Sequence, residues 1–153
     1  MGALFGKDPE PEPKILWSPY PPVSGVERIS PQGWVPYEDV SRRYDKVIIK
    51  GKKLVYGILA DTNSMDRFMD HSHMVVCETD FDRGKLIVGD IISFNAGTGS
   101  DILHQIIKIV EDGQGRLYTV QGTNNDRPDP YQIRNQHIKG VLVTLIYTKR
   151  RLP

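Results

Sequence analysis

The chain has 153 residues, a formal net charge of +1 from 20 basic and 19 acidic residues, and a hydrophobic fraction of 39%. This length allows one domain with a real core plus an appendage, and it is too short for two ordinary domains. The balanced charge excludes a nucleic-acid-binding protein that works by bulk charge, so we expect no nucleic-acid partner.

Neither a disulfide nor a membrane span is expected. The single cysteine, Cys77, has no partner for an internal disulfide. A spanning helix needs about eighteen or more apolar residues, whereas the longest apolar candidate, residues 141–147, is interrupted by Thr144. The N-terminal residues lack the long apolar core of a secretory signal peptide. We therefore expect a soluble chain in the cytoplasm or in a larger assembly.

The first 45 residues predict an extended, proline-rich arm. They hold eight of the eleven prolines and both tryptophans. Neither a helix nor a central strand tolerates this density of proline, so only residues 36–43 favour a helical turn. The arm also carries large aromatic side chains that are unfavourable in water, namely Trp17, Tyr20, Trp34 and Tyr37. We expect residues 15–40 to pack on their own domain or to mediate self-association or partner docking, and residues 1–14 to be free of the domain.

Residues 46–153 predict one mainly β domain. Short runs rich in β-branched residues alternate with Gly, Asn and Asp, and only residues 66–70 favour another helical turn. The predicted strands cover residues 46–50, 53–60, 73–78, 86–95, 102–111, 116–121 and 137–148. Seven short strands in about 100 residues favour a coiled β-sheet or a barrel over a doubly wound fold.

Three segments carry residue types suited to hydrolytic chemistry. They are Thr62-Asn63-Ser64-Met65, the strand pair containing Gly89-Asp90 and His104, and the loop Gly122-Thr123-Asn124-Asn125-Asp126-Arg127-Pro128-Asp129. In this order and spacing, residues 54–148 resemble the type I signal peptidases, in particular the archaeal and endoplasmic-reticulum branch. The bacterial branch and the SOS-repressor self-cleaving peptidases share the fold but use Lys where this chain has His104.

The resemblance implies a role for each of these segments. It makes Ser64 the nucleophile, His104 the general base and Asp129 the acid that orients the imidazole. A serine hydroxyl is a weak nucleophile and needs a base, but forty residues separate Ser64 from His104, so only tertiary folding can bring them together. We expect the backbone N–H of Ser64 to stabilise the oxyanion, with a contribution from Thr62 or Asn63.

The expected function is a soluble serine endopeptidase that cuts an extended peptide or protein substrate without a cofactor. Strand addition along the sheet edge beside Ser64 would bind such a peptide. Two alternatives stay open. In the first, the chain is an assembly protein that keeps the peptidase fold and docks through its arm. In the second, the arm is the chain's own substrate or pro-segment.

A metal site is conceivable but not favoured. His71, His73 and Cys77 would share one face of a strand, which suits a metal ion. Solvated histidines on a strand face are the commoner arrangement, so we predict no metal.

Overall fold

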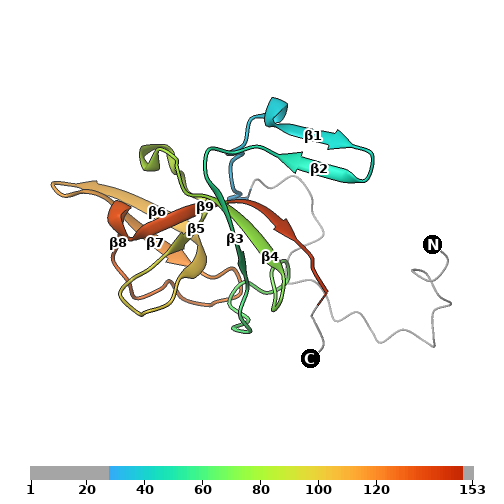
Figure 1. The fold of residues 1–153 in the computed structure, drawn as a ribbon. Coiled ribbons are helices and arrows are strands. Elements are labelled where there is room, and N and C mark those ends of the chain that lie inside the picture. The colour runs from blue at the N-terminus through green and yellow to red at the C-terminus, as the bar shows by residue number, and fades with distance from the viewer. Residues whose placement is uncertain (1–27, 150–153) are drawn as a thin grey trace, which may run out of the picture.

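The computed structural model describes residues 28–149, which form a mainly β structure (Figure 1). Its main feature is a curled, seven-stranded antiparallel sheet with the strand order β3-β4-β9-β5-β6-β7-β8. A separate two-stranded sheet pairs β1 with β2 and projects from the body as a hairpin. The predicted mainly β class is confirmed.

The elements follow one another in a simple order along the chain. The strands are β1 (Val40–Arg43), β2 (Lys46–Ile49), β3 (Leu54–Ile58), β4 (Met74–Glu78), β5 (Ile91–Phe94), β6 (Ile102–Asp112), β7 (Gly115–Gln121), β8 (Ile133–Arg134) and β9 (Ile138–Ile146). In the described part of the chain, three short 3₁₀ helices connect them: η2 (Tyr37–Asp39), η3 (Arg83–Lys85) and η4 (Asn135–His137). Within residues 28–149, no helix is long and apolar enough to cross a bilayer.

Most predicted strands are confirmed, and the differences have local causes. The strand expected at 86–95 begins only at Ile91, because Gly89 adopts φ 108° and turns the chain. The helical turn expected at 36–43 is confined to η2, and its second half is strand β1. Strand β8 was not predicted, since two residues are too few to show a pattern.

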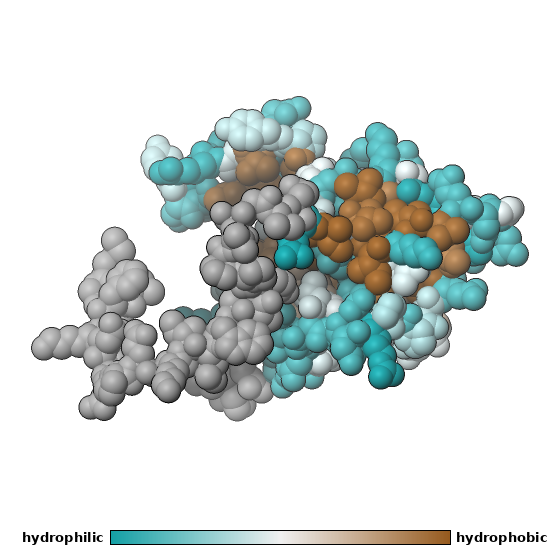
Figure 2. All heavy atoms as spheres, turned by 180° about the vertical axis from the view of Figure 1, so that it is seen from behind, coloured by the Kyte–Doolittle hydropathy of each residue, from teal (hydrophilic) through white to brown (hydrophobic). Residues whose placement is uncertain are grey.

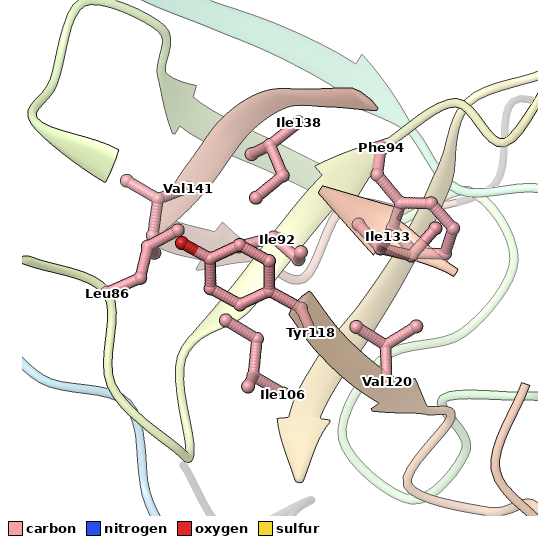
Figure 3. Packing of buried hydrophobic residues seen from close by; sticks show 9 residues of the cluster. All are labelled: Leu86, Ile92, Phe94, Ile106, Tyr118, Val120, Ile133, Ile138 and Val141. Carbon is pink, nitrogen blue, oxygen red and sulfur yellow. The ribbon is translucent and has the colours of Figure 1, made fainter. Parts of the chain in front are cut away.

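The core formed by the described residues consists of two clusters on opposite faces of the sheet. Consecutive residues Ile91 and Ile92 of β5 belong to different clusters, as expected where side chains alternate across a strand. Figure 3 shows the larger cluster, made of Leu86, Ile92, Phe94, Ile106, Tyr118, Val120, Ile133, Ile138 and Val141. The smaller one consists of Met65, Met69 and Ile91.

Irregularities in the strand pairing bend the sheet. The register shifts between Val76 and Cys77, between Ser93 and Phe94, and between Ile106 and Lys108. Such bulges kink a strand and increase its twist. They account for the curl that brings segments from both ends of the sheet toward one another.

The described part of the predicted arm lies partly on the domain. Trp34 packs edge-on against Phe81, with ring centroids 5.2 Å apart, whereas Tyr37 is 93% exposed and does not pack on the domain. Trp17 and Tyr20 lie outside the described residues. The predicted boundary between residues 45 and 46 falls in the turn of the β1–β2 hairpin, so this hairpin takes one strand from each predicted part.

Candidate active site

Ser64 lies in a turn that follows β3, and buried methionine side chains hold this turn on the domain. Met65 and Met69 are buried beneath this turn, and the backbone N–H of Met69 donates to the carbonyl oxygen of Met65 at 3.2 Å. Asn63 precedes Ser64 in a left-handed conformation with φ 58°, which Asn adopts more readily than most residues. The turn therefore places the Ser64 hydroxyl at the surface, with a hydrophobic anchor on the next residue.

His104 lies on β6, where it pairs with Ile92 of β5. Its side chain is 9% exposed and faces the larger core cluster, with its ring 6.4 Å from that of Phe94. Pairing with β5 fixes the backbone of His104, and the neighbouring Phe94 ring limits the orientation of its imidazole.

Asp129 lies in the loop after β7. Its backbone N–H donates to the carbonyl oxygen of Val120 at 2.9 Å, which fixes the loop against the end of β7. The Asp129 side chain is only 7% exposed, whereas that of Asp126, in the same loop, is 93% exposed. Of the two carboxylates, only that of Asp129 points into the protein.

The three side chains form a continuous hydrogen-bonded chain. The distance from Ser64 Oγ to His104 Nε2 is 2.9 Å, and that from His104 Nδ1 to Asp129 Oδ2 is 2.6 Å. With the proton of the neutral imidazole on Nδ1, His104 donates to Asp129 and accepts from the Ser64 hydroxyl. This arrangement suits proton transfer from a serine nucleophile to a histidine that a carboxylate orients. The structure thus brings together the three residues that the sequence singled out.

Two loops are fastened together at Ser64. Asn124 donates from its backbone N–H to the Ser64 carbonyl oxygen and from its side-chain amide to the Asn63 carbonyl oxygen, both at 2.9 Å. Gly122 lies so close that a Cβ atom there would clash with the Ser64 carbonyl and lie 3.0 Å from His104 Nε2. The sequence motif contained both residues, but only the structure shows these contacts. They hold the nucleophile beside the base.

The predicted oxyanion residues lie beside the nucleophile. The Thr62 hydroxyl oxygen is 3.3 Å from Ser64 Oγ. Asn63 contributes its main-chain carbonyl to the Asn124 contact. A hydroxyl next to the nucleophile can donate to charge that develops on a bound carbonyl.

A cavity of about 230 Å³ lies between the β3 segment and the start of β6. It is lined by residues 55–59 of the β3 segment and, across from them, by Ile102 and Leu103, next to His104. Strand β3 ends the sheet, so among the described residues its outer edge has no strand neighbour. A larger cavity of about 570 Å³ lies beside the hairpin, and none of the three catalytic candidates lines either cavity.

The residues considered for a metal do not form a site. Across residues 28–149, no three His, Cys, Asp or Glu side chains are grouped to hold an ion. His71 lies 3.6 Å from an oxygen of Asp61, and His73 packs its ring against Tyr147. Burial raises the pKa of the Cys77 thiol to about 11, which disfavours a thiolate ligand.

Comparison with known proteins found no matching family model, no matching curated protein and no matching solved structure.

Proposed function

We propose that this protein is a serine endopeptidase, with Ser64 as nucleophile, His104 as general base and Asp129 as the residue that orients the base. The observation that carries the proposal is the hydrogen-bonded chain from Ser64 Oγ through both nitrogens of His104 to Asp129 Oδ2, at 2.9 and 2.6 Å. A chance contact between a surface serine and a histidine would not also place a buried carboxylate on the other nitrogen of the imidazole.

The geometry supports an acyl-transfer mechanism. Ser64 Oγ attacks the scissile carbonyl as its proton passes to His104 Nε2, and the Asp129 carboxylate stabilises the imidazolium that forms. The Ser64 backbone N–H and the Thr62 hydroxyl stabilise the oxyanion. His104 then protonates the leaving amine, and water hydrolyses the acyl-enzyme with His104 again as base.

The free edge of β3 supports an extended peptide as the substrate. A peptide strand that pairs with β3 gains main-chain hydrogen bonds, and its alternate side chains enter the cavity of about 230 Å³. Nucleophile after β3, base on β6 and acid after β7 follow the order of the type I signal peptidases. This order and the curled sheet support a fold of that type, related to the SOS-repressor peptidases.

Single substitutions test the proposal directly. Ser64→Ala and His104→Ala should each lower kcat/KM by on the order of 10⁴-fold or more, and the double variant should be no worse, because the two residues act as a unit. Cleavage is measured on a proteome-derived peptide library, with new termini identified by mass spectrometry.

A second serine and a second histidine provide matched controls. Ser100→Ala changes an exposed serine, and His71→Ala changes a histidine whose Nδ1 lies 3.6 Å from Asp61, so both variants should cleave normally. An intact Ser64→Ala protein that still cleaves, or a wild-type protein that cleaves nothing, would contradict the proposal.

A second candidate function is favoured by the β1–β2 hairpin. It exposes Tyr44 (99%) and Val47 (70%), and Tyr37 at its base is 93% exposed. Figure 2 shows apolar side chains on the projecting hairpin, bordered by hydrophilic ones. Such exposure supports an assembly protein whose hairpin packs on a second copy of the chain.

A further inference from the structure

Asp90 is a fully buried carboxylate that no mechanistic step uses. Its oxygens accept four hydrogen bonds: from the backbone N–H of Ile87 (3.0 Å), the backbone N–H of Gln32 (3.0 Å), the Gln32 amide (3.3 Å) and the Trp34 indole (3.3 Å). A buried carboxylate is unfavourable unless it is well hydrogen-bonded. Three of its four donors come from residues 30–34, here called the strap.

The strap runs in direct contact with the turn that contains Asp90. Gly89 has φ 108°, and a Cβ atom there would overlap the backbone of Ser30. The Gln32 amide also donates to the carbonyl oxygen of Lys85 at 2.8 Å, and Trp34 packs on Phe81. The strap is therefore seated on this turn by backbone approach, hydrogen bonds and aromatic packing together.

The same turn is bonded to β6 next to the candidate base. The Gly89 N–H donates to the Ile106 carbonyl, and the Ile106 N–H donates to the Asp90 carbonyl, both at 2.8 Å. The side-chain amide of Gln105 donates to the Gly89 carbonyl at 2.9 Å. Residues 105 and 106 directly follow His104, so the position of the turn bears on the position of the imidazole.

We infer that the strap positions His104, and that Asp90 is the positioning residue through which it acts; the inference rests on the proposed function. With the strap seated, the Gly89–Asp90 turn holds β6 in the register that gives the 2.9 Å distance between Ser64 Oγ and His104 Nε2. With the strap released, Asp90 loses three donors, and the turn and β6 relax together. Activity then depends on a segment that touches neither the substrate nor the catalytic residues.

The test is the double variant Gln32→Met/Trp34→Phe in the full chain. It removes both side-chain donors to Asp90 while keeping a side chain of similar length at position 32 and an aromatic ring against Phe81. We expect kcat to fall about 10- to 100-fold, because small misplacements of a catalytic group have effects of this size. KM should change by less than about twofold, since the edge of β3 proposed to bind the peptide is untouched. The ¹⁵N resonances of the His104 imidazole should shift, and the acid limb of the pH–rate profile should move.

A structural control separates positioning from stability. Arg134→Gln removes the paired hydrogen bonds of Arg134 to Asp112, at 3.0 and 2.8 Å, which lie away from the strap. It should lower stability yet leave kcat, the pH profile and the His104 resonances unchanged in the folded protein.

The outcomes are distinct. Unchanged His104 resonances in folded Gln32→Met/Trp34→Phe would overturn the strap inference whether or not the wild type is a peptidase. If the double variant shifts the His104 resonances but the wild-type protein has no cleavage activity, the coupling between strap and His104 stands and only the proposed function is rejected. A loss of kcat that Arg134→Gln reproduces at equal stability would show that the strap is merely structural.

Discussion

Asp129 and Asp126 show how one residue acquires a role that its neighbour cannot take. Both lie in the loop after β7, and sequence reasoning chose Asp129 from the family resemblance. In the structure, Asp129 approaches His104 Nδ1 at 2.6 Å, whereas Asp126 makes a 4.0 Å contact with Arg127, and both of these side chains are largely exposed. An ion pair so exposed contributes little.

We therefore predict a clear ranking of two substitutions. Asp129→Asn should lower kcat by about 10³- to 10⁴-fold, because an amide cannot stabilise the imidazolium and can favour the wrong tautomer. Asp126→Asn should change kcat by less than about twofold, since its side chain contacts no catalytic group. Steady-state cleavage of a peptide taken from the library measures both, and the reverse ranking would assign the role to Asp126.

Among the elements, the linker between β2 and β3 is held by one carboxylate. Glu78, at the end of β4, is 6% exposed and accepts from the backbone N–H groups of Lys52 (2.7 Å), Lys53 (2.8 Å) and Asp80 (2.9 Å). Burial alone raises the pKa of Glu78, but the backbone N–H groups of these three residues and Thr79 outweigh it, so the net pKa is lowered. This clamp fixes the start of β3, and with it the edge proposed to bind substrate.

The lowered pKa fixes the sign of a pH effect on stability. The unfolded carboxyl group binds a proton at higher pH than the folded one, so the stabilisation is complete above the unfolded pKa and is lost as the pH falls through the folded pKa. Glu78→Gln should lower the free energy of unfolding at pH 7 by about 2 kcal/mol. The difference from wild type in urea titrations should shrink toward pH 3. A difference that stays constant with pH would contradict this explanation.

An exposed glutamate provides the control for Glu78. The Glu111 side chain is 75% exposed and lies 3.5 Å from Arg116 Nε. Glu111→Gln should therefore change stability by less than about 1 kcal/mol at either pH.

At the scale of the whole molecule, the hairpin is the part that the body does not cover. Within residues 28–149, strands β1 and β2 pair only with each other, and a two-stranded hairpin is marginally stable alone in water. The strap leads into η2 at the start of the hairpin, and the Glu78 clamp holds the linker that follows β2. The hairpin is thus tethered at both ends while Tyr44 and Val47 stay exposed.

If the hairpin serves assembly, removing its apolar side chains should reduce self-association. Tyr44→Ser/Val47→Ser should lower the mass found by sedimentation equilibrium at tens of micromolar, because the contact loses on the order of 100 Å² or more of apolar surface. Tyr147→Ser, at a 64% exposed tyrosine outside the hairpin, should leave the mass unchanged. A wild-type protein that sediments as a monomer would exclude this second function and leave the peptidase proposal intact.

The sequence alone determined the mainly β class, most strand positions and the candidates Ser64, His104 and Asp129. Local composition governs strand formation, because β-branched runs bounded by Gly and Asn favour strands wherever they lie. The order of the motifs singled out the site residues through a family resemblance, without any information on distance. The start of β5 was misjudged because Gly89 adopts a positive φ in a turn that the strap contacts from far along the chain, which no local pattern shows.

Only the tertiary structure decided how these residues meet. Residues 64, 104 and 129 are joined because β6 pairs with β5 and β7 in a defined register, and because Asn124 and Gly122 close the loop onto Ser64. The strap on Asp90 and the Glu78 clamp likewise depend on hydrogen bonds between segments 25 to 58 residues apart. Such contacts form only once burial of the two clusters has paid the entropy of closing these loops, so no local pattern encodes them.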